Sequence, residues 1–382
     1  MQIDKEYIIR IRRELHKVPE ISFDLPKTLA IIRRELDAIG IPYTEEMGKS
    51  SIVATLNEGV GNKTIAIRAD TDALPIEELR ESDFASTHPG KMHACGHDAH
   101  TAMLLGAAKT MKAMEKDIKC CVKFIFQASE EGVSGVNLLC EDGVMKDIDF
   151  IVACHVVPQM QTRRIQLNKT CSNASSRGFR IHLHGKSCHV SRPQDGVDAI
   201  AMAARVYTDI QIMRAREIDP FESLIINIGE IHSGTANNIV SGYAVMNGTI
   251  RSLKNETDSY AYRRIQEIAE NTARDMGGTA EVETYKFSPC LVNDHGVVDA
   301  IIEAAEKVIG SDRINPNKPI SMGAEDFAYY TLQKPGAQFG VGICPDDGKY
   351  APLHNGNFIV NEDGLDVAPA IYVQLVLDQM EK

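Results

Sequence analysis

The residues best suited to chemistry in this sequence gather between positions 92 and 100, in the segment MHACGHDAH. The segment holds His93, Cys95, His97, Asp98 and His100, and an apolar stretch expected to form a helix follows it. Cys95 and His97 are two residues apart, so in an extended or turn segment both side chains can point at one centre. Thiolate and imidazole are good ligands for zinc, manganese or cobalt-type ions, and the positive N-terminus of a following helix favours a thiolate. A polar loop with capping residues is the competing interpretation, and the density of the set favours a metal site.

Two further segments place pairs of carboxylates where a strand is expected to end. Asp70 and Asp72 follow the apolar run 64–68, and Glu130 and Glu131 follow the run 122–126. Sites of α/β proteins form at the carboxyl edge of a parallel sheet. Adjacent carboxylates repel unless positive charge lies nearby, and a metal ion would supply it, with one Glu as ligand and the other as general base. The alternatives are turn chemistry around the two Asp residues and a Glu pair that caps a helix at 133–142.

Two single histidines extend this pattern. His155 follows the apolar run 150–154, and His354 lies in a polar loop after the last expected strand. Either histidine alone would more often be structural. Four separate strand ends that carry His, Cys or Glu are harder to dismiss, so we expect a metal site at the edge of a sheet.

Polar segments in the middle and late parts of the chain could contact a substrate. His189 lies in the loop 185–189, Asn238 in the polar turn 234–239, and Arg251 at the end of an expected strand. An imidazole, an amide and a guanidinium could hold a carboxylate and an oxyanion, although each could equally be a surface residue. Gly323 lies in the segment 321–327, which is expected to open a helix and either caps it or offers main-chain N–H groups to a ligand.

The order of the expected elements predicts an α/β domain with a mixed, largely parallel sheet flanked by helices. Helices are expected over 8–18, 26–39, 99–114 and 133–142, and strands over 51–56, 64–68, 122–126 and 150–154. The pattern resumes after residue 289, with helices over 296–309 and 321–330 and a strand over 338–343.

The middle of the chain has a different pattern. From residue 176 onwards we expect a strand over 178–183, a helix over 198–213, strands over 224–230 and 243–253, a helix over 257–276 and a strand over 279–287. This β-α-β-β-α-β order is ferredoxin-like. We therefore expect residues 1–175 and 290–382 to form one α/β domain, interrupted by a smaller α+β domain over 176–289.

Composition excludes several classes of protein. The chain has 382 residues, more than one hydrophobic core usually fills, and a formal net charge of −12, which argues against a nucleic-acid partner. No apolar run approaches the roughly 18 residues of a membrane span, and the N-terminus has no secretory pattern. The nine cysteines are odd in number and contain no CxxC pair. Reduced thiols in a cytoplasmic enzyme fit this usage.

The segments 68–75, 93–101, 130–132, 234–238 and 322–327, together with His155, resemble the aminoacylase/carboxypeptidase family of di-metal hydrolases. The branch is that of indole-acetyl-amino-acid hydrolases, hippurate hydrolases and N-acetyl-diaminopimelate deacetylases. The resemblance implies that the inserted domain is a lid that also mediates dimerisation. It further implies two divalent ions per subunit, from among zinc, manganese, cobalt and nickel. The implied metal ligands are Cys95, His97, Glu131, His155 and His354.

The resemblance also implies roles for other residues. Glu130 would be the general base, Asp72 would orient a ligand or the base, and Asp70 falls where other branches keep a metal-binding His. His189 would stabilise the oxyanion, often reaching in from the partner subunit. The implied substrate-binding residues are Asn238, Arg251 and Gly323.

The implied reaction is hydrolysis of an N-acyl amino acid, such as an N-acetyl or N-benzoyl derivative, to a carboxylic acid and a free amino acid by metal-activated water. A dipeptidase or carboxypeptidase with the same di-metal site is the alternative. A binding protein that keeps the fold would lack a ligand or Glu130, and none is missing. A thiol enzyme with Cys95 as nucleophile would stay active after chelation.

Overall fold

The computed structural model describes residues 2–132 and 134–380, which fold into two compact units. The first unit takes in the chain up to Ser172, Val292–Pro319 and the chain from Asp326 onwards. The second unit takes in Asn173–Leu291 and the short segment Ile320–Glu325. That segment lies outside the expected insertion, and the expected boundaries at 175/176 and 289/290 stay predictions.

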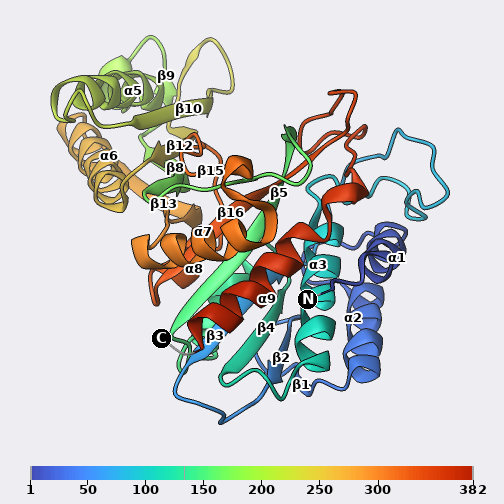
Figure 1. Ribbon diagram of the computed structural model, residues 1–382. Coiled ribbons are helices and arrows are strands. Elements are labelled where there is room, and N and C mark those ends of the chain that lie inside the picture. The colour runs from blue at the N-terminus through green and yellow to red at the C-terminus, as the bar shows by residue number, and fades with distance from the viewer. Residues whose placement is uncertain (1, 133, 381–382) are drawn as a thin grey trace. The chain divides into compact units, whose positions relative to one another are not determined.

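The first unit is built on an eight-stranded sheet in the order β1-β2-β4-β3-β5-β16-β6-β15 (Figure 1). Four neighbouring pairs are parallel: β3 with β4, β3 with β5, β5 with β16, and β6 with β15. The other pairs are antiparallel. The expected mixed, largely parallel sheet is thus confirmed. Its strands are β1 Tyr43–Thr44, β2 Ile52–Leu56, β3 Thr64–Asp70, β4 Cys121–Gln127, β5 Phe150–Gln161, β6 Ile165–Gln166, β15 Ile314–Asn315 and β16 Gly336–Cys344.

Helices flank this sheet, and α3 lies at the centre of their packing. It contacts α1, α2 and α9 as well as β3, and α9 in turn packs against α7. Residues on all sides of α3 are buried, which suits a helix enclosed by both the sheet and other helices. The helices of this unit are α1 Lys5–His16, α2 Pro26–Ile39, α3 His97–Ala113, α4 Gly135–Glu141, α7 His295–Ile309, α8 Ala328–Thr331 and α9 Val367–Gln379.

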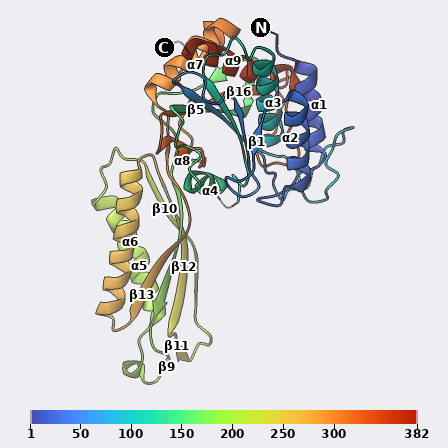
Figure 2. The same ribbon diagram turned by 90° about the horizontal axis from the view of Figure 1, so that it is seen from below.

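The second unit has a four-stranded antiparallel sheet in the order β10-β12-β8-β13, with two helices on one face (Figure 2). Phe179, Ile181 and Leu183 alternate along β8 and face the helices, where they form a second hydrophobic core. The order and the two helices confirm the expected ferredoxin-like pattern. Its elements are β8 Ser176–His184, α5 Ala199–Arg216, β10 Leu224–Ser233, β12 Tyr243–Ser252, α6 Asn255–Asp275 and β13 Thr279–Ser288.

The remaining elements are short. Two of them, β9 and β11, pair with each other at one end of the second unit. Among the described residues, no helix is long and apolar enough to cross a membrane. The short strands and 3-10 helices are β7 Cys171–Asn173, β9 Cys188–His189, β11 Ile239–Val240, β14 Leu291–Val292, η1 Pro193–Asp195, η2 Ser311–Arg313 and η3 Glu362–Gly364.

Three expected elements differ from the structure. The strand expected over 150–154 continues to Gln161, so His155 lies inside β5 rather than after it. The helix expected over 321–330 was wrong, because only the four residues of α8 are helical there. The helix expected from residue 133 begins at Gly135, and residue 133 lies outside the described residues. Gly323 therefore does not lie at a helix N-terminus, which removes the reason for expecting its N–H group to meet a ligand.

Candidate metal centre

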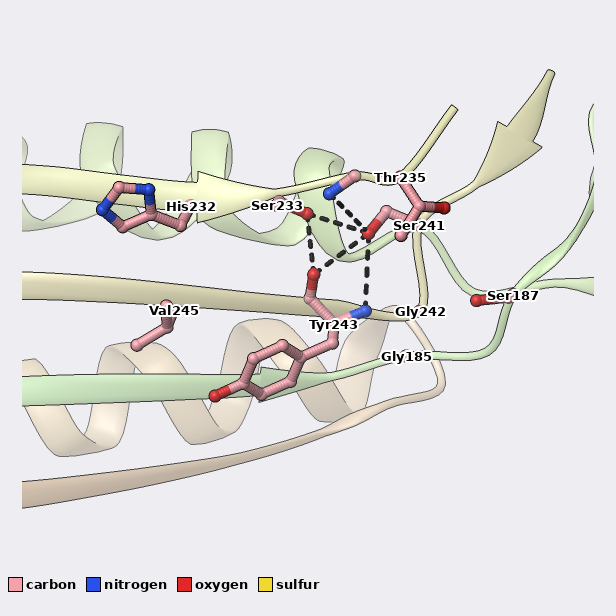
Figure 3. Close-up of a pocket in the computed structure, with 10 residues that line it drawn as sticks. Gly185, Ser187, His232, Ser233, Thr235, Ser241, Gly242, Tyr243 and Val245 are labelled. Carbon is pink, nitrogen blue, oxygen red and sulfur yellow. Dashed lines mark hydrogen bonds between the residues drawn. The ribbon is translucent and has the colours of Figure 1, made fainter. Parts of the chain in front are cut away.

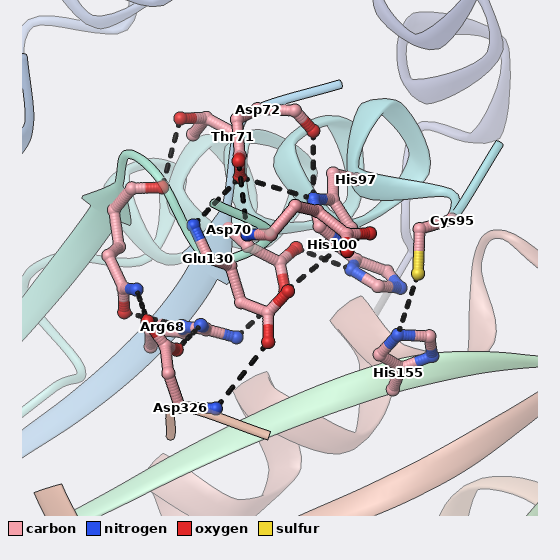
Figure 4. A network of polar contacts seen from close by, with 12 residues as sticks. Arg68, Asp70, Thr71, Asp72, Cys95, His97, His100, Glu130, His155 and Asp326 are labelled. Atoms are coloured by element: carbon pink, nitrogen blue, oxygen red, sulfur yellow. Dashed lines mark hydrogen bonds and ion pairs between the residues drawn. The ribbon is translucent and has the colours of Figure 1, made fainter. Parts of the chain in front are cut away.

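Three strands of the large sheet deliver polar side chains to one edge (Figure 4). Asp70 ends β3, and Asp72 follows two residues later. Glu130 and Glu131 follow β4, which runs parallel to β3. β5, also parallel to β3, carries His155 in its interior. Since the carboxyl ends of parallel strands meet at one edge, these side chains converge.

The five ligands implied by the sequence lie within reach of one another. Donor atoms of Cys95, His97 and His155 lie within 4.8 Å of one another, and so do those of Cys95, Glu131 and His354. Nε2 of His155 is 3.5 Å from Sγ of Cys95, and Nε2 of His354 is 3.1 Å from Oε1 of Glu131. Two groups that share the thiol can hold two ions side by side.

A glycine between two of these residues makes the local backbone possible. Gly96 has φ +86° and is followed at once by α3, which begins at His97. A Cβ atom at this position would lie 2.5 Å from Cγ2 of Val156. Only glycine adopts this left-handed conformation without strain and leaves room for Val156. The turn brings Cys95 and His97 to the same edge.

Hydrogen bonds fix the orientation of two imidazoles. Nδ1 of His97 donates to the main-chain oxygen of Asp72 over 2.8 Å, and Nδ1 of His155 donates to the main-chain oxygen of Val156 over 2.8 Å. A carbonyl oxygen only accepts, so the proton of each neutral ring lies on Nδ1. Each ring therefore presents Nε2 as the metal-binding atom.

The carboxylate of Asp72 holds the start of the next segment. Its Oδ1 accepts from the main-chain N–H of Glu130 over 3.0 Å, and its Oδ2 accepts from that of Glu131 over 3.2 Å. Asp72 thus contacts three parts of the site, since its carbonyl also orients His97. The orienting role that the resemblance implies for Asp72 stays a prediction, and these hydrogen bonds are the contacts through which it would act.

Burial and neighbouring charge shift the pKa values of three candidate ligands. Burial raises the pKa of the Cys95 thiol well above its ordinary value, despite the adjacent helix N-terminus. Burial alone would lower the pKa of His97, but the Asp70 carboxylate raises it overall. Burial alone would raise the pKa of Glu131, but its hydrogen bond with His354 lowers it overall. A thiolate at Cys95 therefore needs the positive charge of a bound cation.

The residues present fit a divalent metal pair. Nε2 of His97 is buried and has no hydrogen-bond partner among the described residues. A buried polar atom without a partner is costly, and a metal bond would satisfy it. Thiolate, imidazole and carboxylate together suit zinc, manganese, cobalt or nickel.

Comparison with known proteins decides the family. Residues 66–378 match the peptidase family M20/M25/M40. This chain belongs to that family. It is a metal-dependent hydrolase of amide bonds.

The names of its relatives in the M20 family indicate different activities, including a carboxypeptidase and a deacetylase. The chain is 33% identical to thermostable carboxypeptidase 2 of Saccharolobus solfataricus over 98% of this chain and 95% of the relative. It is 31% identical to N-acetylcysteine deacetylase of Bacillus subtilis over 98% of this chain and 97% of the relative. A crystal structure of a Bacillus subtilis protein described as a dinuclear metal binding M20 peptidase superposes with a TM-score of 0.85, at 30% identity over 99% of this chain and 98% of that one.

Two other histidines in the segment 92–100 of this M20 hydrolase have different surroundings. Nδ1 of His100 lies 2.6 Å from Oδ1 of Asp70, and Nε2 accepts from the main-chain N–H of Val156 over 2.9 Å. Both ring nitrogens of His100 are therefore engaged by the protein itself. His93 is buried, and burial lowers its pKa to about 3, so its ring is neutral. Asp70 lies against His100, and its Oδ2 is also 3.7 Å from Nε2 of His97.

Sequence reasoning missed a buried charge beneath the M20 site. The guanidinium of Arg68 contacts Asp70, Gln127 and Asp326, and the N–H of Asp326 points at Glu130. Arg68 and Asp326 both belong to the segments that carry the resemblance, but 258 positions separate them. Their ion pair becomes evident only in the folded structure, where β3 and the segment before α8 are adjacent.

In the second unit, the structure brings two of the expected lid residues together. β9 and β11 pair so that His189 lies opposite Ile239, and the N–H of Val190 donates to the main-chain oxygen of Asn238 over 3.1 Å. Segments next to both residues line a hollow of about 520 Å³. Ser241 is central to it, with Oγ 2.9 Å from Oγ of Ser233 (Figure 3).

Arg251 lies elsewhere in the second unit. It is near the end of β12, eight residues beyond Tyr243, while β9 and β11 adjoin the beginning of that strand. At about 3.3 Å per residue, roughly 26 Å of strand separates Arg251 from Tyr243. Its guanidinium donates to Oγ1 of Thr249 over 2.7 Å, and within the described residues it has no ion pair. The structure therefore does not bring Arg251 to His189 and Asn238.

Proposed function

We propose that this protein hydrolyses the amide bond of N-acyl amino acids to a carboxylic acid and a free amino acid. The observation that carries the proposal is the pair of overlapping ligand groups that share Cys95, with Glu130 next to the ligand Glu131. A carboxylate beside a di-metal site is the arrangement required of a general base in metal-assisted hydrolysis.

The proposed ligands of the two divalent ions are the five residues that converge at the sheet edge. When bound, the ions would polarise the amide carbonyl and lower the pKa of a water molecule. The sequence and the geometry leave the native metal open among zinc, manganese, cobalt and nickel. The proposed ligands are Cys95, His97, Glu131, His155 and His354.

Glu130 is the proposed general base. Its main chain is fixed by Asp72, and the N–H of Asp326 lies 3.5 Å from its Oε1. In this role Glu130 takes a proton from the attacking water and returns it to the departing amine. Its position beside Glu131 supports this assignment, because the base must reach water bound next to the ligands.

The second unit supplies the proposed contacts to the substrate. Arg251 is the proposed partner of the substrate carboxylate, because a guanidinium without an ion pair is suited to it. His189 is the proposed oxyanion donor, and Asn238 binds nearby. Roughly 26 Å of strand separates Arg251 from Tyr243, the end of β12 that lies next to His189 and Asn238. One small substrate therefore cannot contact Arg251 together with His189 and Asn238 of the same chain. This separation supports a homodimer in which the partner subunit contributes His189 and Asn238.

A carboxypeptidase or dipeptidase activity is the second candidate. The relative named thermostable carboxypeptidase 2 matches the chain as well as the deacetylase does. The same metal site and the same Arg251 would serve a peptide whose free carboxylate is bound. Gly323 remains a proposed main-chain contact, now without the support of a helix N-terminus.

The experiment that tests the proposed function is an assay of metal-reconstituted protein on matched substrates. N-acetyl and N-benzoyl derivatives of several amino acids are compared with dipeptides that end in the same amino acids. We expect the N-acyl amino acids to have the higher kcat/KM. A higher kcat/KM for the dipeptides would favour the second candidate.

A further inference from the structure

Arg68 is a buried cation at the sheet edge. It lies on β3 with 1% of its surface exposed. Its Nη1 donates to Oδ2 of Asp70 over 2.8 Å, its Nη2 to Oδ1 of Asp326 over 2.6 Å, and its Nε to Oε1 of Gln127 over 2.9 Å. One guanidinium thus binds two carboxylates and an amide that come from three separate parts of the chain (Figure 4).

One branch of this network leads to a metal ligand. The other oxygen of Asp70 accepts from Nδ1 of His100 over 2.6 Å. Nε2 of His100 then accepts from the main-chain N–H of Val156 over 2.9 Å. Val156 follows His155 in β5, and its carbonyl orients the His155 ring. The position of His155 therefore depends on a continuous chain of bonds that starts at Arg68.

The other branch leads to the general base. Asp326 is held on both oxygens, by Arg68 and by Nε2 of Gln127 over 2.6 Å. Gln127 is itself fixed by the hydroxyl of Tyr330 at 3.1 Å. With its side chain clamped, Asp326 presents its main-chain N–H to Oε1 of Glu130 at 3.5 Å.

The chemistry of the side chain explains why an arginine is needed here. The planar guanidinium offers donors in three fixed directions, which match the three partners of Arg68. A lysine at the same place would keep the positive charge but would not offer hydrogen-bond donors in fixed directions. The two buried carboxylates, Asp70 and Asp326, need that positive charge because burying them unpaired is costly.

We propose that Arg68 is a positioning residue that connects the two halves of the active site. Through Asp70 and His100 it positions the metal ligand His155, and through Asp326 it positions the general base Glu130. The inference rests on the proposed function for the roles of Glu130 as general base and His155 as metal ligand.

The test separates the two branches with single variants. His100→Gln replaces the rigid imidazole with a flexible amide, which weakens the fixed bridge between Asp70 and the main chain of Val156. Asp326→Asn keeps the shape of the side chain but removes its charge. Arg68→Lys weakens both branches while it keeps the buried charge. Arg177→Lys is the matched control, because Arg177 is a partly buried arginine that pairs with the buried Asp258 at 2.6 Å within the second unit.

Four quantities are measured on each full-length variant. They are the dissociation constant for Co²⁺ by chelator competition, the thermal midpoint of the metal-stripped protein, and kcat and KM at saturating metal. We expect His100→Gln to raise the dissociation constant about 10- to 100-fold, the usual effect of removing a partner of a metal ligand. We expect Asp326→Asn to lower kcat about 10-fold or more at unchanged KM and metal affinity, since a 1 Å misplacement has such effects.

Arg68→Lys should show both changes, and Arg177→Lys should lower only the thermal midpoint. The proposal is overturned if Arg68→Lys leaves metal affinity and kcat at the values of the control. It is also overturned if every variant loses affinity and kcat together in proportion to its thermal midpoint. If Arg68→Lys does not fold, the metal affinity of His100→Gln and the kcat of Asp326→Asn decide whether the two branches position His155 and Glu130. Absence of hydrolysis by the unchanged protein would refute the proposed function, while the Co²⁺ affinities would still decide the positioning of His155.

Discussion

The imidazole of His97 donates its Nδ1 proton to the main-chain carbonyl of Asp72, over 2.8 Å. This bond leaves Nε2 as the only ring atom that can bind a metal ion. The carboxylate of the same Asp72 holds the main chain of Glu130 and Glu131. One residue thus sets the distance between a proposed ligand and the proposed base, and the predictions below depend on that arrangement.

Replacing the proposed base should separate metal binding from turnover. Glu130→Gln keeps the size of the side chain and its main-chain bond to Asp72, so both metal ions should remain bound. Without a carboxylate to accept the proton of water, kcat should fall about 10²- to 10⁴-fold. Metal content by elemental analysis and kcat on an N-acyl amino acid check this. Normal turnover by the variant would show that Glu130 is not the base.

Gly96→Ala should damage both the fold and the metal site. The substitution forces an alanine to φ +86° and places Cβ 2.5 Å from Cγ2 of Val156. Backbone strain of this kind costs about 1–3 kcal/mol, and the displaced Cys95 and His97 should bind metal more weakly. Thermal midpoint and Co²⁺ affinity are the measurements. Gly143→Ala is the control, because Gly143 also has positive φ but no atom near its Cβ. Equal Co²⁺ affinities in the two variants would contradict the prediction.

Arg251→Ala should weaken the binding of substrates that have a free carboxylate. Loss of a charge-assisted hydrogen bond costs about 1.5–3 kcal/mol, which corresponds to a fall in kcat/KM of roughly 10- to 100-fold. For the corresponding amino-acid amides, whose carboxylate is blocked, wild-type and variant should differ little. Equal losses on both kinds of substrate would show that Arg251 does not recognise the carboxylate.

The stability of the first unit should depend on the protonation of His16. Nδ1 of His16 lies 2.7 Å from Oδ2 of Asp98, and Nε2 lies 3.2 Å from Oε1 of Glu78. Burial alone would lower the pKa of His16, but Asp98 and then Glu78 raise it overall, against the nearby Arg12. The imidazolium is therefore stabilised in the folded protein relative to the unfolded chain.

The sign of the pH effect follows from that raised pKa. The stabilisation by His16 is fully present below the unfolded pKa of about 6.5 and is lost as pH rises through the higher folded pKa. Between these two values, wild-type should lose up to about 1.4 kcal/mol per pH unit relative to His16→Gln. Thermal midpoints of both proteins from pH 5.5 to 9 measure the difference. A difference that grows with pH would contradict the account.

The candidate ligands were proposed from sequence because they are reactive residue types that lie near the ends of apolar runs or in polar loops, and their role as ligands stays a prediction. Cys95 and His97 share a turn, Glu131 follows the buried strand β4, and His155 lies inside β5, so local pattern was enough to single them out. The two sheets were also predictable, since the apolar runs alternate with helical ones. The strand expected over 150–154 is shorter than the observed β5, because His155 interrupts the apolar run inside the buried strand.

Contacts between distant segments could not be predicted in the same way. Arg68 and Asp326 meet only because β3 and the segment before α8 are adjacent in the folded first unit. The bonds of His100 to Asp70 and Val156 likewise join segments that are distant in the sequence, so its role in holding β5 could not be read from the segment 92–100. The helix expected over 321–330 failed because residues 320–325 pack with the second unit instead of continuing α8.

The most direct test of the central claim is the release of free amino acid from N-acyl amino acids by metal-stripped and metal-reconstituted protein. The account predicts that stripping lowers kcat at least about 100-fold and that adding two equivalents of a divalent ion per chain restores it. Full activity in the stripped protein, with elemental analysis confirming that no metal remains, would contradict the account.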